Sequence, residues 1–253
     1  IIQWFDFFGQ SLCTYKYQMS VDQQVRNFYS ELQFPGPYSI DDLQFHCPEP
    51  KNPFLKIIHD NIGPNTSVLD IGCGTGLICN LMAMNNPSAD FLGLDFSDAV
   101  DYAQHFAEHN EISNIRFVKQ DILNFQNTDT YDVVLCQGVL HHIPQFELAV
   151  EKINCLLKPN GVLILGVYHP TGKILKKYVK LKYVNHMLTQ DQEAVPFELS
   201  FTRQQVQELF QDFSLVQQYP RNSVANFVLH PLQHSYNGGL TTYILKKQAI
   251  RFR

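Results

Sequence analysis

Residues 68–76 read Val68-Leu69-Asp70-Ile71-Gly72-Cys73-Gly74-Thr75-Gly76 and form the most informative stretch of this 253-residue chain. A short apolar run enters three glycines, and the residues that follow, 77–84, have a helical pattern of apolar side chains. Because glycine has no side chain, a ligand can closely approach the backbone amides at the start of that helix. The stretch therefore predicts a strand, a ligand-binding turn and a helix.

Strand-like and helix-like segments alternate along the rest of the chain. Such alternation is typical of a parallel sheet with helices on both faces, so we predict an α/β fold. In sheets of this kind the ligand lies beyond the carboxyl ends of the strands. The predicted strands are residues 67–71, 91–94, 115–119, 131–136, 161–167, 213–219 and 240–246, and the predicted helices include 77–84, 97–110, 146–157 and 204–210.

The first part of the chain, residues 1–62, departs from this alternation and indicates a helical N-terminal extension or cap. Phe28 and Tyr29 belong to an apolar pattern at helical spacing, and the turn-rich break Phe34-Pro35-Gly36-Pro37-Tyr38 follows it. We assign residues 63–253 to one further domain and interpret residues 171–200 within it as a lid-like insertion. The chain begins with an isoleucine rather than methionine, which suggests a piece of a longer protein.

The composition argues against several classes of protein. The chain has 19 basic and 24 acidic residues, a formal net charge of −5, whereas a non-specific nucleic-acid binder needs a basic face. The six cysteines include no C-x-x-C pair, so we expect free thiols, no metal site and a cytoplasmic location. No apolar run reaches the roughly 18 residues that span a bilayer, so we expect no membrane partner.

Acidic residues end the second and third predicted strands. Asp95 follows the glycine-rich turn by one helix and one strand, where a carboxylate can accept hydrogen bonds from both hydroxyls of a ribose. Asp121 is placed to meet the amino group of an adenine, although helix capping remains the alternative for both carboxylates. The glycine spacing is G-x-G-x-G rather than the G-x-G-x-x-G of dinucleotide-binding dehydrogenases, and it suits a ligand without a phosphate.

Together these motifs resemble the class I methyltransferases that use S-adenosylmethionine, of the small-molecule type represented in ubiquinone biosynthesis. The resemblance runs from about Asn65 to Val167, and it implies a Rossmann-like fold with a mostly parallel seven-stranded sheet and helices on both faces. It also implies S-adenosylmethionine as the cofactor and S-adenosylhomocysteine as the product. The segments that carry the resemblance are Val68 to Gly76, Gly93-Leu94-Asp95, Gln120-Asp121-Ile122, Tyr131 to Cys136 with Val139 to Ile143, and Leu156 to Leu163.

The positions that match the family motifs imply contacts with the cofactor. The glycine-rich turn would hold the methionine end, Asp95 the ribose, and Phe96 and Asp121 the adenine, while Gln137 would lie near the sulfonium. The residues implied to bind the cofactor are Asp70, Gly72, Cys73, Gly74, Gly76, Asp95, Phe96, Asp121, Ile122 and Gln137.

Histidines and aromatic residues are the candidates for the methyl-acceptor site. His141 and His142 follow the fourth strand and His169 follows the fifth, and histidine can serve as a general base near neutral pH. A structural histidine that bonds a loop carbonyl is the alternative. The candidate substrate-binding residues, which alternatively fix the N-terminal helix to the core, are Tyr29, Phe34 and Tyr38.

We therefore predict an enzyme, a methyltransferase that acts on a small-molecule acceptor, with O-methylation slightly favoured by the paired histidines. Two alternatives stay open. A methyltransferase of tRNA or other RNA bases would use the basic stretch from Lys173 to Lys182, and a non-catalytic donor-binding domain would serve a larger multidomain enzyme. The sequence leaves the identity of the acceptor and the oligomeric state open.

Overall fold

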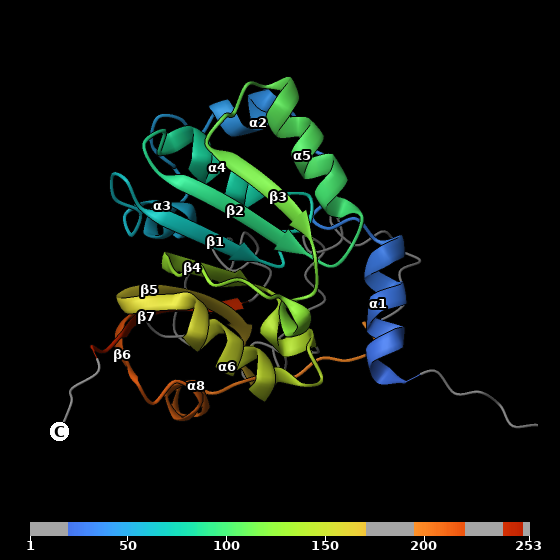
Figure 1. Ribbon diagram of the computed structural model, residues 1–253, viewed down its shortest axis with the longest axis vertical. Helices are drawn as coiled ribbons and strands as arrows, with labels where there is room; N and C mark the ends of the chain where they lie inside the picture. Colours follow the sequence, from blue (N-terminus) through green and yellow to red (C-terminus); the bar gives the residue numbers. More distant parts are fainter. Residues whose placement is uncertain (1–19, 171–194, 221–239, 250–253) are drawn as a thin grey trace, which may run out of the picture.

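One sheet lies between two groups of helices in the computed structural model, which describes residues 20–170, 195–220 and 240–249 (Figure 1). Most of the predicted lid-like insertion, residues 171–194, lies outside these ranges, and so does the basic stretch from Lys173 to Lys182. The prediction of a lid and the assignment of residues 1–62 and 63–253 to separate units therefore stay predictions.

Seven strands form the sheet in the order β3-β2-β1-β4-β5-β7-β6. The strands from β1 to β5 run parallel, whereas β7 is antiparallel to both β5 and β6. The strand order reverses between β1 and β4, and the carboxyl ends at such a reversal form the crevice where open sheets bind ligands. The sheet confirms the predicted fold class. The strands are β1 (Ser67–Ile71), β2 (Asp90–Asp95), β3 (Ile115–Lys119), β4 (Tyr131–Gln137), β5 (Leu157–Tyr168), β6 (Phe213–Tyr219) and β7 (Leu240–Lys247).

Helices cover both faces of the sheet because successive side chains of a strand point to opposite sides. Val68 and Phe91 pack on one face with α2, α3, α4 and α5, whereas Leu69 and Leu92 pack on the other face with α6 and α8. Each face thus has its own apolar core. The helices are α1 (Val21–Glu31), α2 (Ile40–Gln44), α3 (Pro53–His59), α4 (Leu77–Asn85), α5 (Ala99–His109), α6 (Phe146–Leu156) and α8 (Arg203–Leu209), with short 3₁₀ turns η1 (Ile122–Asn124) and η2 (Leu140–His142).

The boundaries of the elements follow the prediction closely, with two instructive differences. β5 begins at Leu157 rather than at Gly161, because Leu157 pairs with Tyr131 of β4 across an irregularity in the register. The helix expected to begin after Ser97 begins at Ala99, and the Ser97 hydroxyl donates a hydrogen bond of 2.7 Å to Asp95. A tertiary contact thus extends β5, and a local hydrogen bond of Ser97 accompanies the later start of α5.

The turn at residues 34–38 attaches the N-terminal helices to the glycine-rich turn. The Phe34 carbonyl accepts a hydrogen bond of 3.0 Å from the Thr75 amide, and the Thr75 hydroxyl donates to the Gly36 carbonyl at 3.2 Å. The Tyr38 hydroxyl donates to the Thr75 carbonyl at 2.9 Å and accepts from the Asn80 side chain at 2.8 Å. These four bonds hold a segment distant in sequence against the start of α4.

We expect the loss of a hydroxyl group at Tyr38 and at Tyr243 to have different effects on the free energy of unfolding. Tyr38→Phe removes a donor to Thr75 and an acceptor for Asn80, so we expect the free energy of unfolding to fall by about 1–3 kcal/mol. Tyr243 is fully buried in β7, and its hydroxyl has no hydrogen-bond partner among the described residues. Tyr243→Phe should therefore leave the free energy of unfolding unchanged or raise it. Urea denaturation checks both variants, and equal losses would contradict this interpretation.

Candidate functional site

The glycine-rich turn after β1 has a backbone that other residues rarely adopt. Gly72, Gly74 and Gly76 have φ angles of +69°, +54° and +80°. A Cβ atom on Gly72 would lie 2.2 Å from a methyl group of Val139, and one on Gly74 would lie 2.1 Å from the carbonyl oxygen of Phe34. The turn therefore packs between the loop after β4 and the N-terminal turn, and glycine is required there by these contacts alone.

Asp95, at the end of β2, holds the glycine-rich turn in place. Its Oδ2 accepts a hydrogen bond of 2.9 Å from the Gly74 amide, and its Oδ1 accepts from the amide and the hydroxyl of Ser97 at 2.9 and 2.7 Å. A carboxylate offers about four acceptor positions, so these three bonds leave capacity for one more donor such as a ribose hydroxyl.

Asp70 lies at the end of β1 and is only 4% exposed. Burial is the main cause that raises its pKa to about 7, the charge of Asp95 adds to this, and a hydrogen bond with Cys79 opposes it. A cation placed beside such a group would favour its ionised form. Asp70 is therefore suited to a positively charged ligand group, such as the ammonium of an amino acid.

Arg26 of α1 contacts two of the predicted adenine-binding residues. Asp121 Oδ1 accepts a hydrogen bond of 2.9 Å from the Leu123 amide at the start of η1, and its Oδ2 forms an ion pair with Arg26. The guanidinium carbon of Arg26 lies 5.5 Å from the centre of the Phe96 ring. Figure 1 shows α1 beside the arrowheads of β1, β2 and β3. Arg26 was not among the predicted site residues, although it lies one helical turn before Tyr29.

Three further residues that were predicted to bind the cofactor are buried or form hydrogen bonds with other parts of the protein. The Gln137 side chain donates to the Ile164 carbonyl at 2.8 Å and accepts from the Thr242 hydroxyl at 3.3 Å. Cys73 and Ile122 are both buried, and burial raises the pKa of the Cys73 thiol. Contact between these residues and a cofactor stays a prediction.

The paired histidines lie in η2, after β4, and both are buried. His142 Nδ1 lies 2.9 Å from the Phe197 carbonyl, which can only accept, so in the neutral ring Nδ1 carries the proton and Nε2 the lone pair. The ring centre of His142 lies 5.6 Å from that of Tyr29, and the ring centre of His141 lies 4.2 Å from that of Tyr168. The carbonyl bond thus orients His142 with its basic nitrogen directed away from Phe197.

Tyr168 and Glu198 belong to the same cluster of side chains, and the sequence analysis missed both. Burial, with the charge of Glu198 as a second cause, raises the pKa of Tyr168 to about 12, and the pKa of Tyr29 is raised by burial and by both neighbours. The next residue, Leu199, donates its amide to the His141 carbonyl at 2.8 Å. No pattern could identify Glu198, because it lies in the stretch that we interpreted as an insertion.

The remaining candidates lie in different places, His169 next to this cluster and Phe34 and Tyr38 beside the glycine-rich turn. His169 follows Tyr168 directly and is partly buried, which lowers its pKa. Phe34 is about half exposed, and Tyr38 packs against Tyr102 and Phe106 while it bonds Thr75. The roles of His169, Phe34 and Tyr38 toward a substrate stay predictions.

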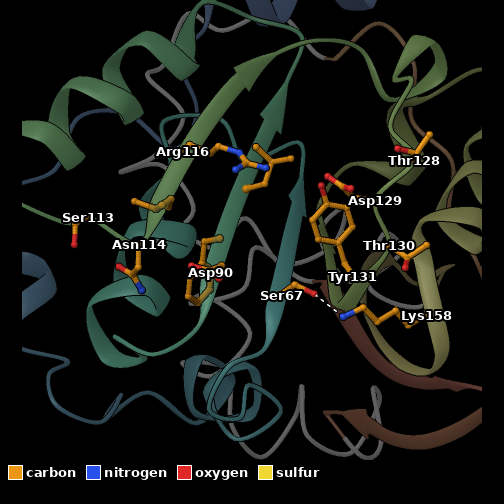
Figure 2. Close-up of a pocket in the computed structure, with 13 residues that line it drawn as sticks. Ser67, Asp90, Ser113, Asn114, Arg116, Thr128, Asp129, Thr130, Tyr131 and Lys158 are labelled. Carbon is orange, nitrogen blue, oxygen red and sulfur yellow. Dashed lines mark hydrogen bonds between the residues drawn. The ribbon is translucent and has the colours of Figure 1, made fainter.

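A cavity of about 680 Å³ lies at the amino ends of the strands, away from the glycine-rich turn (Figure 2). Its lining includes Ser67 and Asp90, the first residues of β1 and β2, together with Arg116 and Lys158. Lys158 donates to the Ser67 hydroxyl at 3.2 Å, the bond dashed in Figure 2. None of the predicted site residues lines this cavity. Since it opens at the amino ends of the strands, it is not where a sheet of this type binds its ligand.

In residues 20–170, 195–220 and 240–249, no group of three His, Cys, Asp or Glu side chains is arranged to hold a metal ion. Over the same part of the chain, no helix has the length and apolar character needed to cross a bilayer.

Comparisons with known proteins converge on one family. A family model described as a methyltransferase domain matches residues 62–218. The chain is 31% identical over 138 residues to the ubiquinone biosynthesis O-methyltransferase of Coxiella burnetii, which covers 53% of this chain and 58% of that protein. It is 32% identical over 125 residues to the enzyme of the same name from Acinetobacter baylyi, covering 48% and 52% of the two chains. The chain thus spans about half the length of the curated relatives that it matches.

Solved structures share the fold at low sequence identity. The magnesium protoporphyrin IX methyltransferase of Synechocystis, solved with bound S-adenosylmethionine, aligns with a TM-score of 0.59 and 15% identity, over 92% of this chain and all of that one. The N-methyltransferase NodS of Bradyrhizobium japonicum, solved with S-adenosylhomocysteine, aligns with a TM-score of 0.53 and 14% identity, over 90% and 98% of the two chains.

Asp70→Asn should flatten the pH dependence of stability. The folded-state pKa of about 7 lies above the usual value, so the folded chain binds more protons than the unfolded chain between about pH 4 and pH 7. The free energy of unfolding therefore falls as the pH rises through that window, by at most about 4 kcal/mol. Urea denaturation near pH 5 and pH 8 should show a smaller fall in Asp70→Asn than in the wild type. Asp90→Asn, at the exposed start of β2, is the control, and parallel curves for wild type and Asp70→Asn would refute the assignment.

Proposed function

This chain belongs to the class I S-adenosylmethionine-dependent methyltransferases, and from that premise we propose that it transfers a methyl group from S-adenosylmethionine to a hydroxyl group of a small molecule. The curated relatives support this choice, since they are named O-methyltransferases. The observation that carries the proposal is the buried His142, oriented by the Phe197 carbonyl beside Tyr29.

The residues at the ends of β1 and β2 fit the donor. Asp70 offers a buried carboxyl group suited to an ammonium, and Asp95 has acceptor capacity for a ribose hydroxyl. When bound, S-adenosylmethionine supplies a methyl group activated by the positive charge of its sulfonium. The protein then has to align donor and acceptor, and alignment alone can contribute about 7–11 kcal/mol to lowering the barrier.

The cluster around His142 supports an acceptor that must lose a proton. A hydroxyl is a weak nucleophile until its proton is removed, and a positioned base contributes about 10²–10⁴-fold to such a step. In our proposal Nε2 of His142 accepts this proton, while Tyr29 and Tyr168 form aromatic walls near it. Glu198 lies close enough to both tyrosines to raise the pKa of each, so it adds a negative charge on this side.

The location and the two alternatives remain part of the proposal. Five free cysteines among the described residues fit a reducing compartment, which supports a cytoplasmic location. A methyltransferase of RNA bases would accept bulk tRNA as a methyl acceptor, and a non-catalytic domain would bind the donor and methylate nothing. Incubation with methyl-labelled donor, a panel of phenols and alcohols, and bulk tRNA distinguishes these functions. Transfer of the labelled methyl group to tRNA alone would overturn the small-molecule assignment.

Asp95→Asn should weaken donor binding. The substitution removes the charge that strengthens the hydrogen bonds with Gly74 and with a ribose, so we expect the Kd for S-adenosylhomocysteine to rise about 100-fold, or about 3 kcal/mol. Asp98→Asn is a matched control, because Asp98 is exposed and pairs with Lys119. Calorimetry measures both variants. An unchanged Kd in Asp95→Asn would show that this carboxylate does not bind the donor.

His142→Gln should slow turnover without changing donor affinity. Glutamine can still donate to the Phe197 carbonyl but offers no base, so we expect the rate with an accepted phenol to fall about 100-fold or more. The Kd for S-adenosylhomocysteine should stay within about twofold, a small free-energy change. His105→Gln, on the exposed surface of α5, is the control. An unchanged rate would end the role of His142 as a base.

A further inference from the structure

We propose that Arg26 of α1 competes with the adenine of the donor for Asp121 and Phe96, so that this side chain must leave before the nucleoside binds. The inference rests on the proposed function, because the family resemblance assigns the adenine to these two residues. The family resemblance gives Arg26 no role. In our inference Arg26 sets the donor affinity because it occupies part of the donor site.

Arg26 uses the same groups that an adenine would need. One guanidinium nitrogen pairs with Asp121 Oδ2, and the Leu123 amide occupies Oδ1 of that carboxylate at 2.9 Å. The guanidinium also lies over the Phe96 ring, with 5.5 Å between its central carbon and the ring centre, which is within the range of a cation–π contact. An adenine amino group and an adenine ring would therefore meet a positive charge already bound at their positions.

The ion pair between Arg26 and Asp121 is partly shielded from water. The side chain of Asp121 is 14% exposed and that of Arg26 is 31% exposed, so water screens this pair less than it screens more exposed pairs such as Lys119–Asp98. The hydrogen bonds and charges of Asp22 and Asp121 together raise the pKa of Arg26 despite its partial burial. Arg26 thus stays charged, and a neutral adenine has to replace an ion pair.

Asp22 provides the position to which Arg26 can withdraw. It lies one helical turn before Arg26 on α1, and its Oδ2 accepts a hydrogen bond of 2.8 Å from Arg26 Nε. When the nucleoside displaces the guanidinium from Asp121, Arg26 keeps a carboxylate partner within its own helix. In this structure Asp22 binds only Nε, so a guanidinium freed from Asp121 can add a second hydrogen bond from Nη2 to the same carboxylate. Because this pairing strengthens only when the site opens, Asp22 lowers the free-energy cost of opening, whereas the ion pair of Arg26 with Asp121 raises it.

This arrangement reduces the apparent donor affinity by the fraction of molecules in which Arg26 has left Asp121. Removing the guanidinium should increase that fraction, and removing Asp22 should decrease it. The two substitutions therefore act in opposite directions on one measured affinity. A simple loss of structure around α1 would weaken binding in both.

The test is calorimetric titration of the wild type and three variants with adenosine and with S-adenosylhomocysteine. Adenosine has no net charge, so a change in its affinity cannot come from general attraction or repulsion by the protein. Arg26→Met keeps the apolar stem and removes the charge, and we expect it to tighten adenosine binding at least threefold. Asp22→Asn should weaken the same binding at least twofold. Lys119→Met, which breaks an exposed ion pair with Asp98 near the end of β3, should leave it unchanged.

Unchanged or weaker adenosine binding in Arg26→Met, with wild-type binding intact, would overturn the inference and leave the proposed function standing. Tighter binding in Asp22→Asn would overturn it as well. If neither ligand binds to the wild type or to any variant that unfolds cooperatively in urea, the proposed function fails and this inference fails with it. Binding to Arg26→Met alone would support the inference strongly.

Discussion

The hydrogen bond between the Gly74 amide and the Asp95 carboxylate is the contact on which the arrangement of the site depends. It joins the turn after β1 to the end of β2, and through Ser97 the same carboxylate reaches the segment before α5. A turn whose glycines all have positive φ has little conformational preference of its own, so an external acceptor has to select one geometry. With that geometry selected, the neighbouring amides of Gly72 and Cys73 bond the Leu94 carbonyl, and the buried Asp70 lies at the end of β1 beside the turn.

Helix α1 connects the two sides of the proposed site. Tyr29 lies 6.4 Å from Phe96 on the proposed donor side and 5.6 Å from His142 on the proposed acceptor side, measured between ring centres. Arg26 reaches the donor side from the preceding turn of the same helix. A shift of α1 would therefore change both half-sites together, which links donor binding to the shape of the acceptor site.

The sequence predicted the parallel sheet, and it indicated candidate residues for the donor site, because both have short-range signals. The glycines, the apolar strand before them and the acids at Asp95 and Asp121 are visible in a window of a few residues. The spacing of Arg26, one helical turn before Tyr29, does not reveal its contact with Asp121, and Glu198 had no short-range signal. The contacts of both residues are with parts of the chain far away in sequence. The start of α5 was misplaced for a different reason, because Ser97 bonds Asp95, two residues earlier, rather than only capping the helix.

The attachment of residues 34–38 to the glycine-rich turn has a consequence for any movement of α1. Only Leu32 and Gln33 connect the end of α1 to Phe34, whose carbonyl is bonded to Thr75. A helix on so short a tether cannot diffuse away, so the Arg26 guanidinium behaves as an intramolecular competitor at a fixed effective concentration, of the order of millimolar for short flexible linkers. Dilution of the protein would not relieve this competition. The concentration of free methyl donor in the cell would set how often the site is filled.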